Sequence, residues 1–197
     1  MITHSRSSPA LPRDALRLWT GLIAIAAPIL HSATDLMELT SDGFTHVQLW
    51  INFAAFLPMP LLLPGICAAL DPRPGRLCFA GALLYGAAFV YFMYTTIYAI
   101  QNDIPDYATL LHDLGFPYTV AGGLMVVGGL LFAIGALRRS PLPRIAVWMF
   151  LLGIATNLVI AIIPAPDILQ TAGSGIRNAG LVLMGLYILN ERTRAKA

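Results

Sequence analysis

The sequence predicts an all-α membrane protein: a bundle of six transmembrane helices with a short interfacial helix between the third and fourth spans. Of its 197 residues, 57% are hydrophobic and 11% are charged, about half the charged share of a soluble domain. A helix crosses the bilayer core with roughly 20 apolar residues, and the chain contains six such runs separated by short turns. The runs are residues 18–38, 47–69, 78–100, 117–137, 144–163 and 170–189.

The basic residues predict the orientation of this bundle. When the loops are assigned alternately to two sides, eleven of the twelve Lys and Arg residues fall on the side of the N-terminus. Short cationic loops stay in the cytoplasm, so we expect a protein of the cell (inner) membrane with both termini cytoplasmic. The charge of +2 therefore reflects topology and indicates no nucleic-acid partner. The eleven residues are Arg6, Arg13, Arg17, Arg73, Arg76, Arg138, Arg139, Arg144, Arg192, Arg194 and Lys196.

The short turns leave no room for a second domain. We expect residues 1–17 to form a disordered cytoplasmic N-terminus, 18–189 the transmembrane domain, and 190–197 a basic cytoplasmic tail. An alternative is a cleavable signal peptide that ends near Thr34. The apolar stretch is long and no Ala-x-Ala pattern ends it, so we prefer a first span.

Prolines shape the first two spans. Pro28 predicts a kink just before His31. After the first span, Thr45 and Gln48 have the spacing of a capping box, which places His46 in the first turn of the second span. The second span is either a bent packing helix or a broken helix that lines a cavity. Its prolines are Pro58, Pro60 and Pro64.

The loop at 101–116 is the longest on the outer side. Apolar residues at helical spacing, followed by Gly115, predict a short helix that lies on the membrane surface as a lid. The glycines of the fourth span predict close helix packing. Cys67 and Cys78 lie at the cytoplasmic ends of their spans and lack C-x-x-C spacing, so we interpret them as reduced core residues.

A polar helix face near the end of the first span is the first candidate site. His31, Asp35 and Glu38 follow an i, i+4, i+7 spacing, so they share one face of a helix. Ionisable side chains are costly within a bilayer, and they mark a functional site by default.

Other polar residues are expected in the same outer layer of the membrane. At 1.5 Å per residue, His31 lies about 10 Å below the outer end of its span. Arg177 is the only outer-side cation, and an unpaired charge there costs several kcal/mol. We expect Asp35, or else Glu38, to be its counter-ion. The remaining members of this layer are Tyr94, Tyr98, Asn157 and Asn178.

This layer has two interpretations. In the first, Arg177 and the acids form a structural salt bridge that fixes the order of the helices. In the second, they line a polar pocket open to the outer leaflet. The pocket would serve a membrane-embedded enzyme or binder of a lipid-like or isoprenoid-like molecule, with membrane lipid around it and no cofactor.

In the enzyme, His31, Asp35 and Glu38 would be catalytic and perform acid/base chemistry. Tyr94, Tyr98, Asn157, Arg177 and Asn178 would bind the substrate. The sequence specifies neither the substrate nor an oligomeric state.

Three alternatives remain open. The first is a divalent metal site at the His31 face with His46 or His112, although no established ligand spacing is present. The second is a transporter of a small solute or ion, for which the proline-rich second span is the only support. The third is a non-catalytic membrane subunit.

Overall fold

The computed structural model describes residues 13–41, 43–163 and 167–194. Within these ranges every regular element is an α-helix, which confirms the all-α prediction. The helices are α1 (Arg13–Ser41), α2 (His46–Phe56), α3 (Met59–Ala69), α4 (Arg76–Gln101), α5 (Tyr107–Arg139), α6 (Arg144–Ile162) and α7 (Asp167–Arg194).

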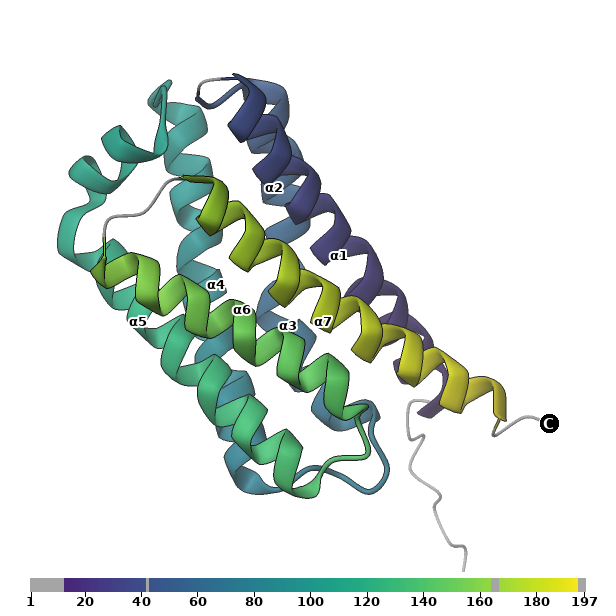
Figure 1. Cartoon of the computed structure of the whole chain (residues 1–197). Helices are drawn as coiled ribbons and strands as arrows, with labels where there is room; N and C mark the ends of the chain where they lie inside the picture. Colours follow the sequence, from purple (N-terminus) through teal and green to yellow (C-terminus); the bar gives the residue numbers. More distant parts are fainter. Residues whose placement is uncertain (1–12, 42, 164–166, 195–197) are drawn as a thin grey trace, which may run out of the picture.

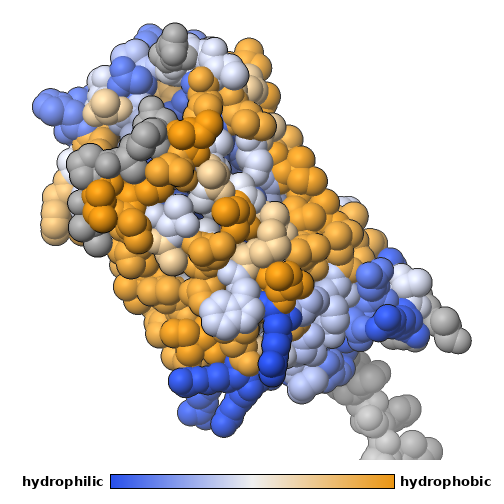
Figure 2. Space-filling model, in the orientation of Figure 1, coloured by the Kyte–Doolittle hydropathy of each residue, from blue (hydrophilic) through white to orange (hydrophobic). Residues whose placement is uncertain are grey.

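The helices have the length and apolarity of membrane spans. Five segments meet that description: α1, α2 together with α3, α4, α5 and α7. Helix α6 is apolar but shorter, with 19 residues. Figure 2 shows a hydrophobic belt across the middle of the face in view, with hydrophilic surface gathered at its ends. The length and apolarity of these helices confirm the prediction of a multi-pass membrane protein.

The helices close a ring. Helix α1 packs against α7, α7 against α6, α6 against α5, and α5 against α4, while α2 and α3 fill the space between α4 and α1. The start of α1, the end of α7 and the α3–α4 and α5–α6 turns all lie at one end of the ring (Figure 1). An ion pair between Arg192 Nε and Asp14 Oδ1, at 2.7 Å, joins the two chain ends there.

Two helix ends differ from the prediction. Helix α1 begins at Arg13, inside the segment expected to be disordered, and α7 continues to Arg194, inside the expected tail. Apolar residues set the predicted limits, but polar residues at the ends of a span extend a helix into the headgroup region. The rest of both predicted segments, residues 1–12 and 195–197, lies outside the described residues.

The second span is broken but tightly packed. Helix α2 ends at Phe56 and α3 starts at Met59, with Pro58 between them. A Cβ on Gly86 of α4 would lie 2.2 Å from the carbonyl oxygen of Pro60, so α4 covers the break closely. This contact favours the bent packing helix over the cavity-lining helix.

Glycines bring α4 and α5 into close contact. A Cβ on Gly128 would lie 2.4 Å from the backbone nitrogen of Tyr85, whereas a Cβ on Gly123 would meet no atom within 4 Å. The packing role predicted for the fourth span therefore applies to Gly128 and not to Gly123.

We expect Gly128→Ala to lower the free energy of unfolding by about 1–3 kcal/mol, because the new methyl group forces two backbones apart. The matched substitution Gly123→Ala should be neutral or slightly stabilising, since Ala favours a helix more than Gly does. Thermal unfolding of both variants in detergent measures the difference. Equal midpoints would contradict this account of the α4–α5 contact.

The predicted helix in the 101–116 loop forms as the first part of α5. It ends at Gly115, whose φ of 54° and ψ of −135° interrupt the helix before the long apolar segment. Leu110 packs with Leu49, Ala99 and Ile104, which ties this short helix to α2 and α4. At its start, the backbone N–H of Thr109 donates to Asp106 Oδ1 at 2.7 Å, and this bond lowers the pKa of Asp106.

The lowered pKa predicts a pH effect on this helix. Asp106 caps it fully above the ordinary aspartate pKa, and the contribution is lost as the pH falls through the lowered value in the folded protein. Hydrogen exchange of the amides in 107–114 should therefore accelerate at acidic pH, beyond the intrinsic change. The Asp106→Asn variant keeps a capping oxygen and should lack this acceleration. If both proteins respond alike, the carboxylate is not the cause.

Candidate functional site

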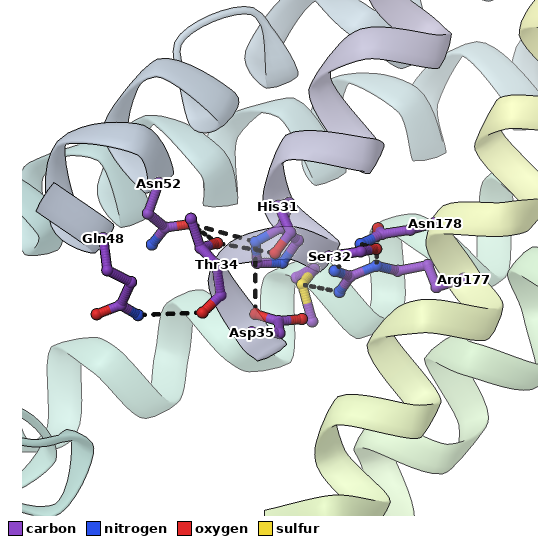
Figure 3. A network of polar contacts seen from close by, with 9 residues as sticks. His31, Ser32, Thr34, Asp35, Gln48, Asn52, Arg177 and Asn178 are labelled. Carbon is purple, nitrogen blue, oxygen red and sulfur yellow. Dashed lines mark hydrogen bonds and ion pairs between the residues drawn. The ribbon is translucent and has the colours of Figure 1, made fainter. Parts of the chain in front are cut away.

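The predicted polar face of α1 points into the bundle at His31. Its side chain is buried, and its Nδ1 lies 3.2 Å from Asn52 Oδ1 of α2 and 3.7 Å from Asp35 Oδ1 (Figure 3). The ring of Phe56 covers it, with centroids 4.8 Å apart. His31 and Asp35 are neighbours, as their spacing predicted, since residues four apart lie about one helical turn from each other.

These neighbours define the tautomer of His31. Both atoms beside Nδ1 are oxygens that accept hydrogen bonds, so Nδ1 carries the proton in the neutral ring. Nε2 then carries the lone pair of the ring. A carboxylate beside one ring nitrogen and an unprotonated second nitrogen are features of a histidine general base.

Thr34 of α1 and two residues of α2, Gln48 and Asn52, add polar contacts that sequence reasoning missed. The Thr34 hydroxyl lies 2.8 Å from the carbonyl oxygen of His31 and 3.2 Å from Asn52 Oδ1, and it can donate its proton to either. Gln48 Nε2 donates to the Thr34 carbonyl at 3.4 Å, in addition to its predicted role in the capping box with Thr45. Asn52 was detectable, because it is an amide within an otherwise apolar run.

Helix α7 contributes Arg177 and Asn178, which are only 3% and 2% exposed. Asn178 Nδ2 donates to Ser32 Oγ of α1 at 3.0 Å. The Nε and one Nη of Arg177 donate to Asn178 Oδ1 at 3.4 and 3.3 Å. The other Nη lies 3.8 Å from the Met125 sulfur of α5, a weak acceptor. This network joins α1, α5 and α7 (Figure 3).

The polar network is incomplete. Among the described residues, Arg177 forms no ion pair with Asp35, so the pairing predicted from the sequence is not made here. A guanidinium has five N–H donors, and the contacts above use three. Three buried oxygens in the described part of the chain also lack a hydrogen-bond partner: Asp35 Oδ2, the Tyr85 hydroxyl and Asn157 Oδ1.

Two of these oxygens belong to the surroundings of Arg177. Tyr85 of α4 interacts with it electrostatically, as His31 does. Asn157 of α6 faces α7 at Gly173, one helical turn before Arg177. A Cβ on Gly173 would lie 3.1 Å from Asn157 Oδ1. Sequence reasoning did not identify Tyr85, because this residue lies in a segment rich in packing residues.

Three predicted site residues lie elsewhere. Tyr94 is 54% exposed on the outside of α4, where its ring contacts Tyr91 and Tyr98. Tyr98 packs on the apolar cluster around Leu110. Glu38 interacts electrostatically with Tyr107 and Tyr118. Helical spacing alone did not reveal which face of α4 is buried.

The histidines proposed as extra metal ligands pair with other carboxylates. His46 Nε2 lies 3.0 Å from Asp103 Oδ1, and His112 Nδ1 lies 3.4 Å from Asp113 Oδ1, with exposed histidine rings in both pairs. In the ranges that the structure describes, no three His, Cys, Asp or Glu side chains gather as a metal site would require. Cys67 and Cys78 are free and buried, with their sulfurs 3.7 Å apart.

Comparisons with protein families, curated proteins and solved structures found no match. The chemistry of the buried network therefore carries the functional proposal.

Proposed function

We propose that this chain is a membrane-embedded enzyme or binder for a hydrophobic small molecule with an anionic or carbonyl head group. Arg177 and Asn178 hold the head group, and His31, oriented by Asp35, exchanges a proton with it. The molecule is lipid-like or isoprenoid-like and enters from the surrounding membrane lipid.

The incomplete pairing of Arg177 carries this proposal. A structural salt bridge would give the guanidinium a carboxylate partner, but its partners among the described residues are an amide and a thioether. An anionic or carbonyl oxygen would supply the missing acceptors through charge-assisted hydrogen bonds. The Tyr85 hydroxyl could donate to the same group.

The surroundings of the network favour a largely apolar ligand. Phe56 covers His31, and Met125 lies against Arg177. The large buried cluster of the bundle is apolar and includes the fully buried side chains of Phe132, Phe150 and Leu181. Sites for hydrophobic molecules combine such walls with a few placed polar groups.

Mass spectrometry of the lipids that co-purify with the protein tests binding. One species should be enriched over the bulk membrane lipid in the wild type and absent from Arg177→Met. The matched variant Tyr94→Phe changes an exposed residue of the outer half and should retain the species. The proposal fails if all three extracts equal the bulk membrane.

A second variant separates an enzyme from a binder. His31→Phe keeps an aromatic ring against Phe56 and removes the proton acceptor. If the protein is an enzyme, the extract of this variant should contain the substrate where the wild type contains product or a mixture. Identical species in both extracts would assign a binding role without acid/base chemistry.

We further propose six spans with both termini in the cytoplasm of the inner membrane. The support is the concentration of arginines at the end of the ring that holds the start of α1 and the end of α7. Reporter fusions after Arg194 and within the 101–106 loop should report opposite sides. The same side for both would overturn this topology.

A further inference from the structure

We propose that the arginine-rich end of the bundle contains a binding site for the phosphate group of a net anionic molecule, such as the headgroup of an anionic lipid. The site is a shallow, open hollow between the start of α1 and the α3–α4 turn. Its polar lining consists of Arg13, Arg17, Asp71 and Arg73. It lies at the opposite end from the His31 network and does not depend on the function proposed above.

Arg17 is held in place for this role. Its Nε donates to the carbonyl oxygen of Ala69 at 3.1 Å. Ala69 is the last residue of α3, and carbonyls at a helix C-terminus lack intrahelical partners. This bond orients the guanidinium, and neither of its Nη groups makes a hydrogen bond within the part of the chain that the structure describes. Arginine presents such donors as a rigid fork that matches phosphate.

The charge around the hollow is positive. Three arginines line it against one carboxylate, Asp71, and that carboxylate is paired with Arg13 Nη1 at 3.0 Å. An adjoining hollow shares Arg17 and Asp71 and adds Glu191, which pairs with Arg194 at 3.2 Å. Both carboxylates are therefore in ion pairs, and Arg17 and Arg73 are not part of either pair.

The hollow lies at the depth of lipid headgroups. Trp19, two residues after Arg17, is 63% exposed, and Trp148, four residues after Arg144, is 55% exposed. Exposed tryptophans concentrate at the boundary between headgroups and acyl chains. The hydrophilic surface beyond the hydrophobic belt is visible in Figure 2. A headgroup phosphate would reach Arg17 while its acyl chains remain against the belt.

The test titrates the full chain in detergent with phosphatidylglycerol, phosphatidylcholine or inorganic phosphate. Native mass spectrometry measures bound lipid, and thermal unfolding measures the effect of each ligand. Phosphatidylglycerol should bind saturably and raise the midpoint, while phosphatidylcholine should not. Arg17→Gln should weaken binding about fivefold or more, the value for the loss of one arginine–headgroup interaction. Arg17→Lys should also weaken it, because the charge remains but the fork is lost.

The matched control is Arg144→Gln, which removes an arginine outside the hollow and should bind lipid as the wild type does. If Arg17→Gln does not fold, Arg73→Gln in the exposed turn replaces it with the same expectation. A midpoint shift with inorganic phosphate alone supports the phosphate site and assigns a soluble source. Equal binding by the wild type and the Arg17 variants, or an equal loss in Arg144→Gln, overturns the proposal.

Discussion

Replacing Asn178 with leucine should lower the free energy of unfolding by about 1.5–3 kcal/mol, the contribution of hydrogen bonds to a charged group. Asn178 Oδ1 is the oxygen that Arg177 contacts through two nitrogens, and Asn178 Nδ2 joins α7 to Ser32 of α1. The hydrogen bond to Ser32 alone would contribute only about 0.6 kcal/mol on average in a membrane bundle. Most of the loss therefore comes from Arg177.

A double variant isolates that charge. In an Arg177→Met background, Asn178→Leu should cost only its bond to Ser32, about 0.6 kcal/mol. This cost is far below the cost in the wild type, so the two effects are non-additive. Asn157→Leu is the matched control, because the buried Asn157 Oδ1 makes no hydrogen bond among the described residues and its removal should cost little. Reversible unfolding in detergent measures the wild type, both single variants, the double variant and the control. A small effect of Asn178→Leu, or additive effects in the double variant, would contradict this account of the network.

Replacing Arg177 alone with methionine should raise the free energy of unfolding by about 2–3 kcal/mol, the cost of an arginine at the centre of a membrane helix. Arg177 is 3% exposed and forms no ion pair among the residues described, so its hydrogen bonds to Asn178 offset only part of the cost of burying its charge. The same variant should lose the co-purified molecule. A gain in stability with a loss of binding is the pattern of a functional residue kept at a cost to stability.

The structural salt bridge predicts the opposite result. In that case Arg177→Met and Asp35→Ala would each destabilise the protein, and the double variant would be no less stable than either single variant. Unfolding measurements on these three proteins decide between a latch and a site. In the structure Asp35 Oδ1 faces His31 at 3.7 Å, and Asp35 Oδ2 makes no hydrogen bond among the described residues.

Local geometry made part of the candidate site predictable. His31 and Asp35 are one helical turn apart, and any helix over this segment places them together. The capping box of Thr45 and Gln48 is likewise a relation between residues three apart, and the structure confirms it. The break at Gly115 follows from the conformations that glycine alone adopts readily.

Contacts between distant segments were beyond the reach of the sequence. Tyr94 and Tyr85 both lie on α4, and their spacing does not indicate that one is 54% exposed and the other fully buried. The face of α4 that turns inward is decided where Gly81 and Gly128 let it approach α5. An apolar membrane helix carries little hydrophobic asymmetry, because lipid and protein interior are equally apolar.

The sequence by itself determined the all-α class, the membrane character and the polar face of α1, because each depends on composition or on residues within one or two helical turns. Only the tertiary structure decided that Arg177 meets Asn178 and Met125 instead of Asp35, and that Ser32 and Asn178, 146 residues apart, join α1 to α7. Side-chain partners across a bundle depend on the rotation and crossing of every helix. Those quantities are set by packing around the whole ring.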